Sequence, residues 1–188
     1  MGRIMQRHRW PALVLFLSGL LMFPVPIGHT AETPNDRMVR YLLLTVHAFR
    51  EVYVESVLKP LAEIGVEPKE HAQDDPHGVL LPFQFVKLAG AMIKDFDIGL
   101  ISLTPIYASN FPKTRAEVEA LQTLATEPRG KILTFADGNQ YKGVMGDFAI
   151  EQLCADCHNA HANSHKTDFK KGDLMGAVVI RLKMRNAN

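Results

Sequence analysis

CADCHNAHANSHKTDFKKGDLMG, the stretch from Cys154 to Gly176, carries most of the information in this 188-residue sequence. It begins with Cys154-Ala-Asp-Cys157-His158 and uses the only two cysteines of the chain. A Cys-x-x-Cys-His pattern is the attachment sequence of c-type haem. Each thiol forms a thioether bond with one vinyl group of the porphyrin, and the adjacent histidine can bind the iron. We therefore expect Cys154 and Cys157 to hold one haem c covalently, with His158 as its proximal axial ligand.

Three other uses of the cysteine pair are open. A disulfide is the simplest alternative in an exported protein. A zinc site could use Cys154, Cys157, His161 and His165, although the gap before His161 is far shorter than the finger spacing of about twelve residues. A thioredoxin-like redox pair is expected after an early strand, whereas this pair lies late in the chain. The histidine directly after the second cysteine favours haem.

The N-terminus is typical of an export signal. Arg3, Arg7 and Arg9 form a basic start, Ala12 to Phe23 is almost entirely apolar, and Ala31 offers a small residue for cleavage. The apolar run is shorter than the ~20 residues of a membrane-spanning helix. We expect residues 1–31 to be a signal peptide and the protein to be periplasmic and soluble. The alternative is an uncleaved segment that anchors the chain to the inner membrane.

The remaining residues, 32–188, are expected to form a single haem c domain. The chain has 21 basic and 20 acidic residues, and loss of the signal peptide removes only basic ones. The exported part is therefore slightly acidic, which gives no support to nucleic-acid binding. A redox or signalling protein partner and a homodimer both remain open. We expect membrane contact only if the N-terminal segment stays uncleaved.

Helical patterns come first in this region, and strand patterns follow. Asp36 is expected to cap a long helix to about Ile64, which Pro60 ends or kinks. The apolar residues of this helix recur at three- and four-residue spacing: Val39, Leu42, Leu43, Val46, Phe49, Tyr53 and Val57. Pro82 opens a second helix, and a capping box of Thr114 and Glu117 opens a third.

Four strands are expected, and the second and third form a hairpin around Asp137-Gly138. Helices followed by mostly antiparallel strands predict an α+β fold. The strand patterns cover Ile98–Leu103, Lys131–Phe135, Gln140–Ile150 and Met175–Met184.

The C-terminal block resembles the Tll0287-like haem domain, also called the DUF3365 family. The resemblance rests on Cys154 to His161 and on Lys166-Thr-Asp-Phe through Gly172-Asp-Leu-Met-Gly176. It is supported upstream by Ile101-Ser102, Pro105, Asn110, Pro112 and Glu117, and by the helix around Phe49 to Val57. It implies a PAS-like fold with a central antiparallel sheet, flanking helices and one covalent haem c. It also implies that Cys154 and Cys157 hold the haem and that His158 is the proximal ligand.

The resemblance does not supply a second axial ligand. Some relatives use a cysteine there, and this chain has no third one. His47 and Met92, both on predicted helices, are candidate distal ligands. Without a distal ligand the iron is open, and a pocket lined by Phe83, Phe85, Val86 and Phe111 would favour NO or CO.

These observations leave three hypotheses for the function. The first is haem-based binding or sensing of redox state or of a diatomic gas such as NO or CO, with a partner protein that receives the signal. The second is mono-haem electron transfer. The third is a small haem peroxidase, which needs a distal acid–base residue, and His47 is the obvious candidate for it. Non-enzymatic haem function is favoured over catalysis.

Overall fold

The computed structural model describes residues 31–184 except 67, 71 and 76. Apart from Ala31, the predicted signal peptide lies outside these residues. The described residues from Glu32 onward group into one compact unit. None of the helices in the described part has the length and hydropathy needed to cross a membrane. The elements are α1 (Pro34–Tyr53), a π-helical segment (Val54–Leu58), α2 (Lys59–Glu63), α3 (Pro82–Ala91), β1 (Phe96–Ile101), α4 (Arg115–Leu124), β2 (Ile132–Asp137), β3 (Gln140–Phe148), α5 (Gln152–Ala160) and β4 (Leu174–Lys183).

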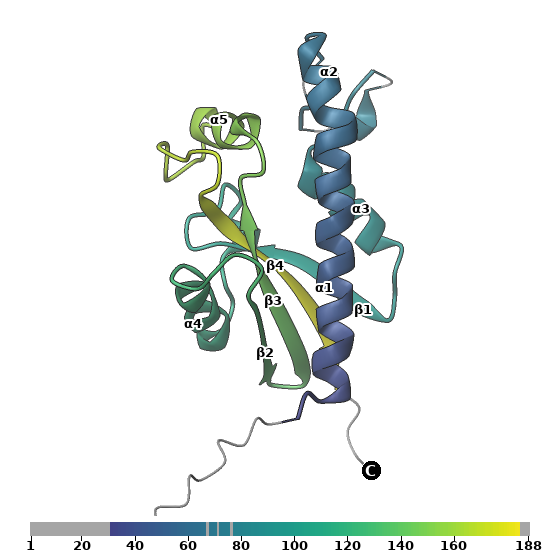
Figure 1. Cartoon of the computed structure of the whole chain (residues 1–188), viewed down its shortest axis with the longest axis vertical. Coiled ribbons are helices and arrows are strands. Elements are labelled where there is room, and N and C mark those ends of the chain that lie inside the picture. The colour runs from purple at the N-terminus through teal and green to yellow at the C-terminus, as the bar shows by residue number, and fades with distance from the viewer. Residues whose placement is uncertain (1–30, 67, 71, 76, 185–188) are drawn as a thin grey trace, which may run out of the picture. The chain divides into compact units, whose positions relative to one another are not determined.

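A four-stranded antiparallel sheet with the order β1-β4-β3-β2 is the centre of the fold. α1 packs on β3 and β4, and α4 packs on β2 and β3 from the opposite face (Figure 1). The expected α+β class is confirmed, with its central antiparallel sheet, flanking helices and long N-terminal helix.

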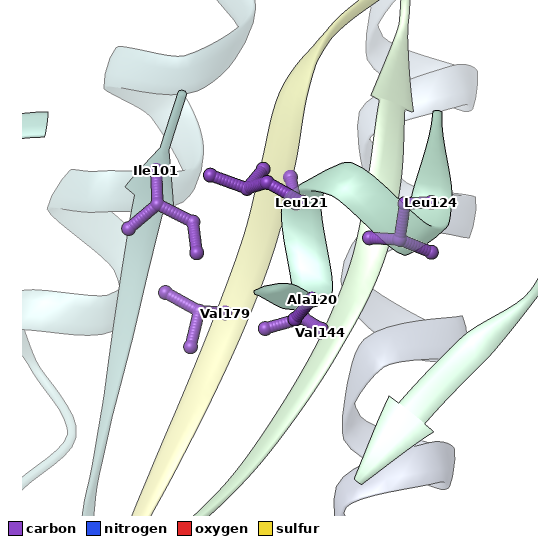
Figure 2. Packing of buried hydrophobic residues seen from close by; sticks show 7 residues of the cluster. Ile101, Ala120, Leu121, Leu124, Val144 and Val179 are labelled. Carbon is purple, nitrogen blue, oxygen red and sulfur yellow. The ribbon is translucent and has the colours of Figure 1, made fainter. Parts of the chain in front are cut away.

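β4 is buried on both faces because a helix covers each side of the sheet. Successive side chains of a strand point to opposite faces. Val178 and Ile180 accordingly pack in the cluster under α1, whereas Ala177 and Val179 pack in the cluster under α4. Figure 2 shows the α4 side, where Leu121 lies over the sheet. This double burial explains why the sequence of β4 is almost continuously apolar.

The long helix starts earlier than the sequence predicted. Thr33, and not Asp36, is its N-cap: the Thr33 hydroxyl accepts a hydrogen bond from the Asp36 N–H at 3.1 Å. Asp36 completes the capping box and also accepts hydrogen bonds from the hydroxyls of Thr134 on β2 and Tyr141 on β3. Its carboxylate therefore fastens the start of α1 to the sheet, and these bonds lower its pKa.

Pro60 does not end the helix. The chain passes through the π-helical segment, where the Lys59 N–H donates to the carbonyl of Val54, and continues as α2 to Glu63. A proline ring in a helix clashes with the carbonyl four residues earlier. The wider π turn just before Pro60 relieves this clash, and such turns are frequent at functional sites. Gly65, with φ of 78°, follows the helix end.

The buried face of the long helix differs from the predicted stripe. Phe49 and Val57 are exposed, by 63% and 38%. The buried positions are Val39, Leu43, Arg50, Val54 and Leu58, which recur almost every four residues. A charged residue, Arg50, thus occupies the face that apolar spacing alone assigns to Phe49.

Glu117, at the start of α4, is fully buried and connects the helix to the sheet. Its Oε1 accepts from Lys142 Nζ of β3 at 2.8 Å and from Arg181 Nη2 of β4 at 3.3 Å. Lys142 also pairs with Asp137 of β2 at 2.7 Å, and Arg181 pairs with Asp97 of β1 at 2.7 Å. The network therefore includes a residue from each of the four strands.

Only half of the predicted capping box forms at α4. The Thr114 hydroxyl accepts from the Glu117 N–H at 3.3 Å, but Glu117 Oε2 accepts from the backbone N–H of Lys113 at 2.7 Å. Burial alone would raise the pKa of Glu117, but the hydrogen bond from Lys142 and the nearby positive charges outweigh burial. The net pKa lies below the usual range.

We expect Glu117→Gln to lower the free energy of unfolding at pH 7 by about 3–5 kcal/mol, because it leaves Lys142 and Arg181 short of a buried counter-charge. Urea unfolding measures this. Since the folded-state pKa of Glu117 is depressed, its contribution is fully present above the unfolded value of about 4.3 and is lost as the pH falls through the lower folded value. The difference between the two proteins should therefore shrink below about pH 4.

Glu119→Gln is the matched control on the same helix. Its side chain is 57% exposed and pairs with Arg115 at the surface. Exposed pairs of this kind contribute about 0–1 kcal/mol. Equal unfolding free energies for Glu117→Gln and Glu119→Gln would contradict the role given to the buried network.

Candidate functional site

The long helix extends past the end of the sheet. Along β3, Gly143, Met145 and Asp147 face α1 in turn. A Cβ on Gly143 would lie only 2.8 Å from Val39, so the helix and strand approach closely there. Asp147 meets Arg50 next to the last strand residue, Phe148. β3 ends near Arg50. The part of the long helix after Arg50 therefore faces elements other than β3.

A cavity of about 690 Å³ lies in this region. Volumes of this size are typical of sites for small molecules and cofactors. Its walls come from the long helix, the start of α3, the loop after β1, and α5, which follows β3 (Figure 1). The apolar part of the lining includes Val54, Leu58, Ala62, Leu81, Phe83, Leu100, Ile106, Leu153 and Met175.

The three residues of the haem motif all line this cavity. Cys154, Cys157 and His158 lie on α5, where i and i+3 or i+4 positions share one helix face. Cys154 is half-buried, and Cys157 is exposed. The motif therefore forms a short helix, and it presents both thiols and the imidazole to one space.

The residues after the motif hold α5 in place. Asn159 bonds the backbone of Phe169 twice: its Nδ2 donates to the carbonyl at 2.8 Å, and its Oδ1 accepts from the N–H at 2.9 Å. The buried Phe169 ring packs edge-on against the His158 ring, with centroids 5.9 Å apart. Lys166 Nζ lies over the Phe169 ring, 4.6 Å from its centroid. The Lys-Thr-Asp-Phe segment thus restricts the orientation of His158.

The Gly-Asp turn that follows fixes the other end of this loop. Gly172 has φ of 95°, a conformation that favours glycine. Its N–H donates to the carbonyl of Ala149, and the Ala149 N–H donates to the carbonyl of Asp173, both at 2.9 Å. These bonds join the start of the α5 segment to the turn before β4. Residues 149–173 therefore form one closed loop that carries the motif.

Arg50 and Asp147 form a buried ion pair in the wall of the cavity. Arg50 Nη2 lies 2.9 Å from Asp147 Oδ1, and the side chains are only 6% and 10% exposed. The sequence reading missed both residues. The sequence does mark both residues as unusual, because each is charged within an otherwise apolar pattern. Arg50 lies at helical spacing between Val46 and Val54, and Asp147 lies in the strand Val144–Phe148.

His158 is electrostatically close to this pair. Burial lowers the pKa of His158, the charge of Asp147 acts in the opposite direction, and His161 and Arg50 lower it further. The net pKa is below the usual value, so the imidazole is neutral at neutral pH. Neutral imidazole is the form that binds metal ions.

A second polar group, around Glu70, closes the cavity near α5. Glu70 accepts hydrogen bonds from the Tyr107 hydroxyl and from His161 Nε2, the latter at 2.9 Å. The Asn163 N–H donates to His161 Nδ1 at 3.1 Å, which leaves the proton of the neutral ring on Nε2. Burial and the Glu70 carboxylate raise the pKa of Tyr107 to about 12.

The two distal candidates lie elsewhere. Arg50 is the first residue of α1 that lines the cavity, and His47 comes before it in the chain. The Nε2 atom of His47 lies 3.1 Å from Glu51 Oε1. Met92 lies just past the end of α3, and its side chain is 85% exposed. Neither residue lines the cavity. α3 ends one residue before Met92, so that side chain leaves the apolar face of the helix.

The expected aromatic pocket is also dispersed. Phe83 lines the cavity, but Phe111 lines a smaller one of about 420 Å³. Phe85 stacks on Tyr53 with centroids 4.7 Å apart, and Val86 is a buried residue of α3. These residues lie on different faces of α3 and on a separate loop, so they cannot all face one ligand.

The geometry does not support a disulfide or a zinc site at the cysteine pair. The two sulfurs are not joined in a disulfide. Within residues 31–184, leaving out 67, 71 and 76, no group of three or more His, Cys, Asp or Glu side chains is placed to hold a metal ion. His161 is engaged with Glu70, and His165 lines the smaller cavity.

Comparisons with known proteins identify a family and a solved structure of similar fold. Among solved structures, the chain is similar to the cyanobacterial heme-protein Tll0287, with a TM-score of 0.58 and 13% identity over 83% of this chain and 99% of that chain. At this identity the likeness shows a shared fold. No curated protein matches the sequence. The family model described as Tll0287-like matches residues 29–183. Because that match spans most of the sequence, this protein belongs to the Tll0287-like family.

Proposed function

We propose that this protein is an exported mono-haem c-type cytochrome that binds or senses a diatomic gas such as NO or CO, or the redox state of its surroundings. The observation that carries the proposal is the convergence of Cys154, Cys157 and His158 on one largely apolar cavity of about 690 Å³. A solved structure of similar fold is that of a haem protein.

The residues fit a covalently bound haem. Two thiols and one imidazole on a single short helix are the donor set that such a group needs. The aliphatic wall of Val54 and Leu58 suits the flat apolar face of a porphyrin. Bound there, haem would supply an iron centre for ligand binding or one-electron transfer. The protein would hold the group, orient His158 through Phe169 and limit the access of water.

The long helix supports an open iron site. Its cavity-lining residues are Arg50, Val54, Leu58, Lys59, Ala62 and Glu63, which include no histidine, methionine or cysteine among the described residues. Lys59 Nζ is engaged with Glu55 and Glu151 at 3.3 and 3.7 Å.

Other potential ligands in the lining are held by protein contacts. Met175 packs with Ala155 in the cluster beneath α5. His161 Nε2 is directed to Glu70. The raised pKa of Tyr107 disfavours the phenolate that iron would need. If His158 were the protein's single ligand to the iron, an external ligand could still bind there, which favours binding or sensing over electron transfer.

Electron transfer is the second candidate function. The exposed position of Cys157 favours it, because an accessible haem edge helps exchange of electrons with a protein partner. A peroxidase needs an acid–base residue above the iron. His47, the candidate for this role, does not line the cavity, so the geometry gives peroxidase chemistry no support.

We expect Cys154→Ser combined with Cys157→Ser to abolish covalent haem, because no thiol remains to form a thioether. The exported protein would lose the haem stain that wild type retains on a denaturing gel. His165→Ala is the control, since His165 lies outside the large cavity, and it should retain full staining. Absence of a Soret band in the exported wild-type protein would overturn the haem assignment.

We expect the ferrous wild-type protein to be high-spin and to bind CO and NO readily, because the described cavity lining presents no unengaged strong ligand opposite His158. Absorption spectra before and after gas addition measure this. His47→Ala should leave spin state and gas affinity within about twofold of wild type, since His47 lies outside the cavity. A low-spin ferrous haem that ignores both gases would favour electron transfer instead.

A further inference from the structure

Arg50 has hydrogen-bond donors that the protein does not satisfy. Its Nε and Nη1 are buried and have no partner among the described residues. Asp147 contacts Nη2 only as a charge pair, because Oδ1 accepts no well-oriented hydrogen bond. The residue is 5% exposed and lines the cavity. Buried donors without partners are costly, and charged ones more so.

We propose that Arg50, positioned by Asp147, is an anion-binding residue that receives a carboxylate or another small anion inside the cavity. The inference rests on the proposed function only in that haem occupies the same space. Guanidinium groups form strong charge-assisted hydrogen bonds with such anions. The described residues provide no partner for Nε or Nη1, and Arg50 lies in the wall against which an occupant of the cavity would rest.

The charges of the cavity support this assignment. Lys59, the other lysine or arginine of the lining, is neutralised by Glu55 and Glu151. Arg50 has a single counter-ion and retains unpaired donors. It is therefore the cation of the lining that can still bind an anion. The anion has two possible sources, which are a haem propionate and a free anion that binds the iron.

Asp147 acts as a positioning residue. It follows Gly143 and Met145 on the α1 face of β3, next to a register shift between Asp147 and Phe148. Its carboxylate holds the guanidinium against the end of the sheet and offsets part of its buried charge. Removal of Asp147 alone should therefore misplace Arg50 and weaken anion binding, even though it removes a negative charge from the site.

The test uses the exported, haem-loaded protein and the variant Arg50→Gln. Resonance Raman spectra report the propionate bending band, and absorption titrations of the ferric protein give its affinities for azide, an anion, and for imidazole, which is neutral. Arg40→Gln is the matched control, because Arg40 is an exposed arginine on the same helix. Arg50→Gln combined with Asp147→Asn removes both buried charges and serves if the single variant does not fold.

The two sources give different results. If Arg50 binds a propionate, Arg50→Gln shifts the propionate band and makes the midpoint potential more negative, while azide affinity stays within twofold. If Arg50 binds a free anion at the iron, azide affinity falls at least tenfold, and imidazole affinity and the propionate band do not change. In that second case Asp147→Asn should also weaken azide binding, which simple removal of a repelling charge would not do.

The proposal is overturned if Arg50→Gln matches Arg40→Gln in both the propionate band and azide affinity, including the case in which wild type binds no azide. Ordered water alone would then satisfy the guanidinium. The haem stain on a denaturing gel keeps this result separate from the proposed function. Wild type without haem contradicts the proposed function, whereas haem-loaded protein that is insensitive to Arg50→Gln contradicts only the anion site.

Discussion

The buried contact between Arg50 and Asp147 is the point on which the functional part of the molecule depends. It joins the long helix to the end of β3. Arg50 Nη2 lies 2.9 Å from Asp147 Oδ1, and both side chains are almost fully buried. On one side of this contact the helix packs on the sheet through Val39 and Leu43. On the other side the same helix face lines the cavity. A pair of charges thus marks the boundary between the structural core and the site.

The cavity exists because two elements extend past the sheet and are held apart. The long helix continues through its π-helical segment beyond Arg50, and α5 follows β3 from the opposite wall. α5 is too short to be stable alone. It is fixed by Asn159 and Phe169 and by the backbone bonds of Ala149. The residues after the motif, which carry the resemblance to the family, therefore support the motif helix and restrict the orientation of His158.

The secondary structure was predictable wherever local chemistry decides it. Pro82 starts α3, the Asp137-Gly138 turn joins β2 and β3, and the β-branched run forms β4, as the patterns indicated. The errors have local competitors as their cause. Thr33 displaced Asp36 as the N-cap because both fit the same capping box. Of the two outcomes expected at Pro60, an end or a kink, the end does not occur, because a π turn accommodates the ring. Apolar spacing predicted that Phe49 lies on the buried face of the long helix. Arg50 lies there instead, because it pairs with the opposite charge of Asp147.

The sequence by itself carried the prediction of haem attachment, since Cys154, Cys157 and His158 are close in the chain and a single helical turn brings them to one face. It also determined the α+β class and the family, through patterns that are local in the sequence. Only the tertiary structure decided what faces these residues. Arg50, Glu70, Tyr107 and Asp147 come from separate elements, and His47 and Met92 lie away from the cavity. The reason is physical: which side chains meet across a cavity depends on how far a helix extends past a sheet and on where buried charges find partners. Neither is encoded in the spacing of any one segment.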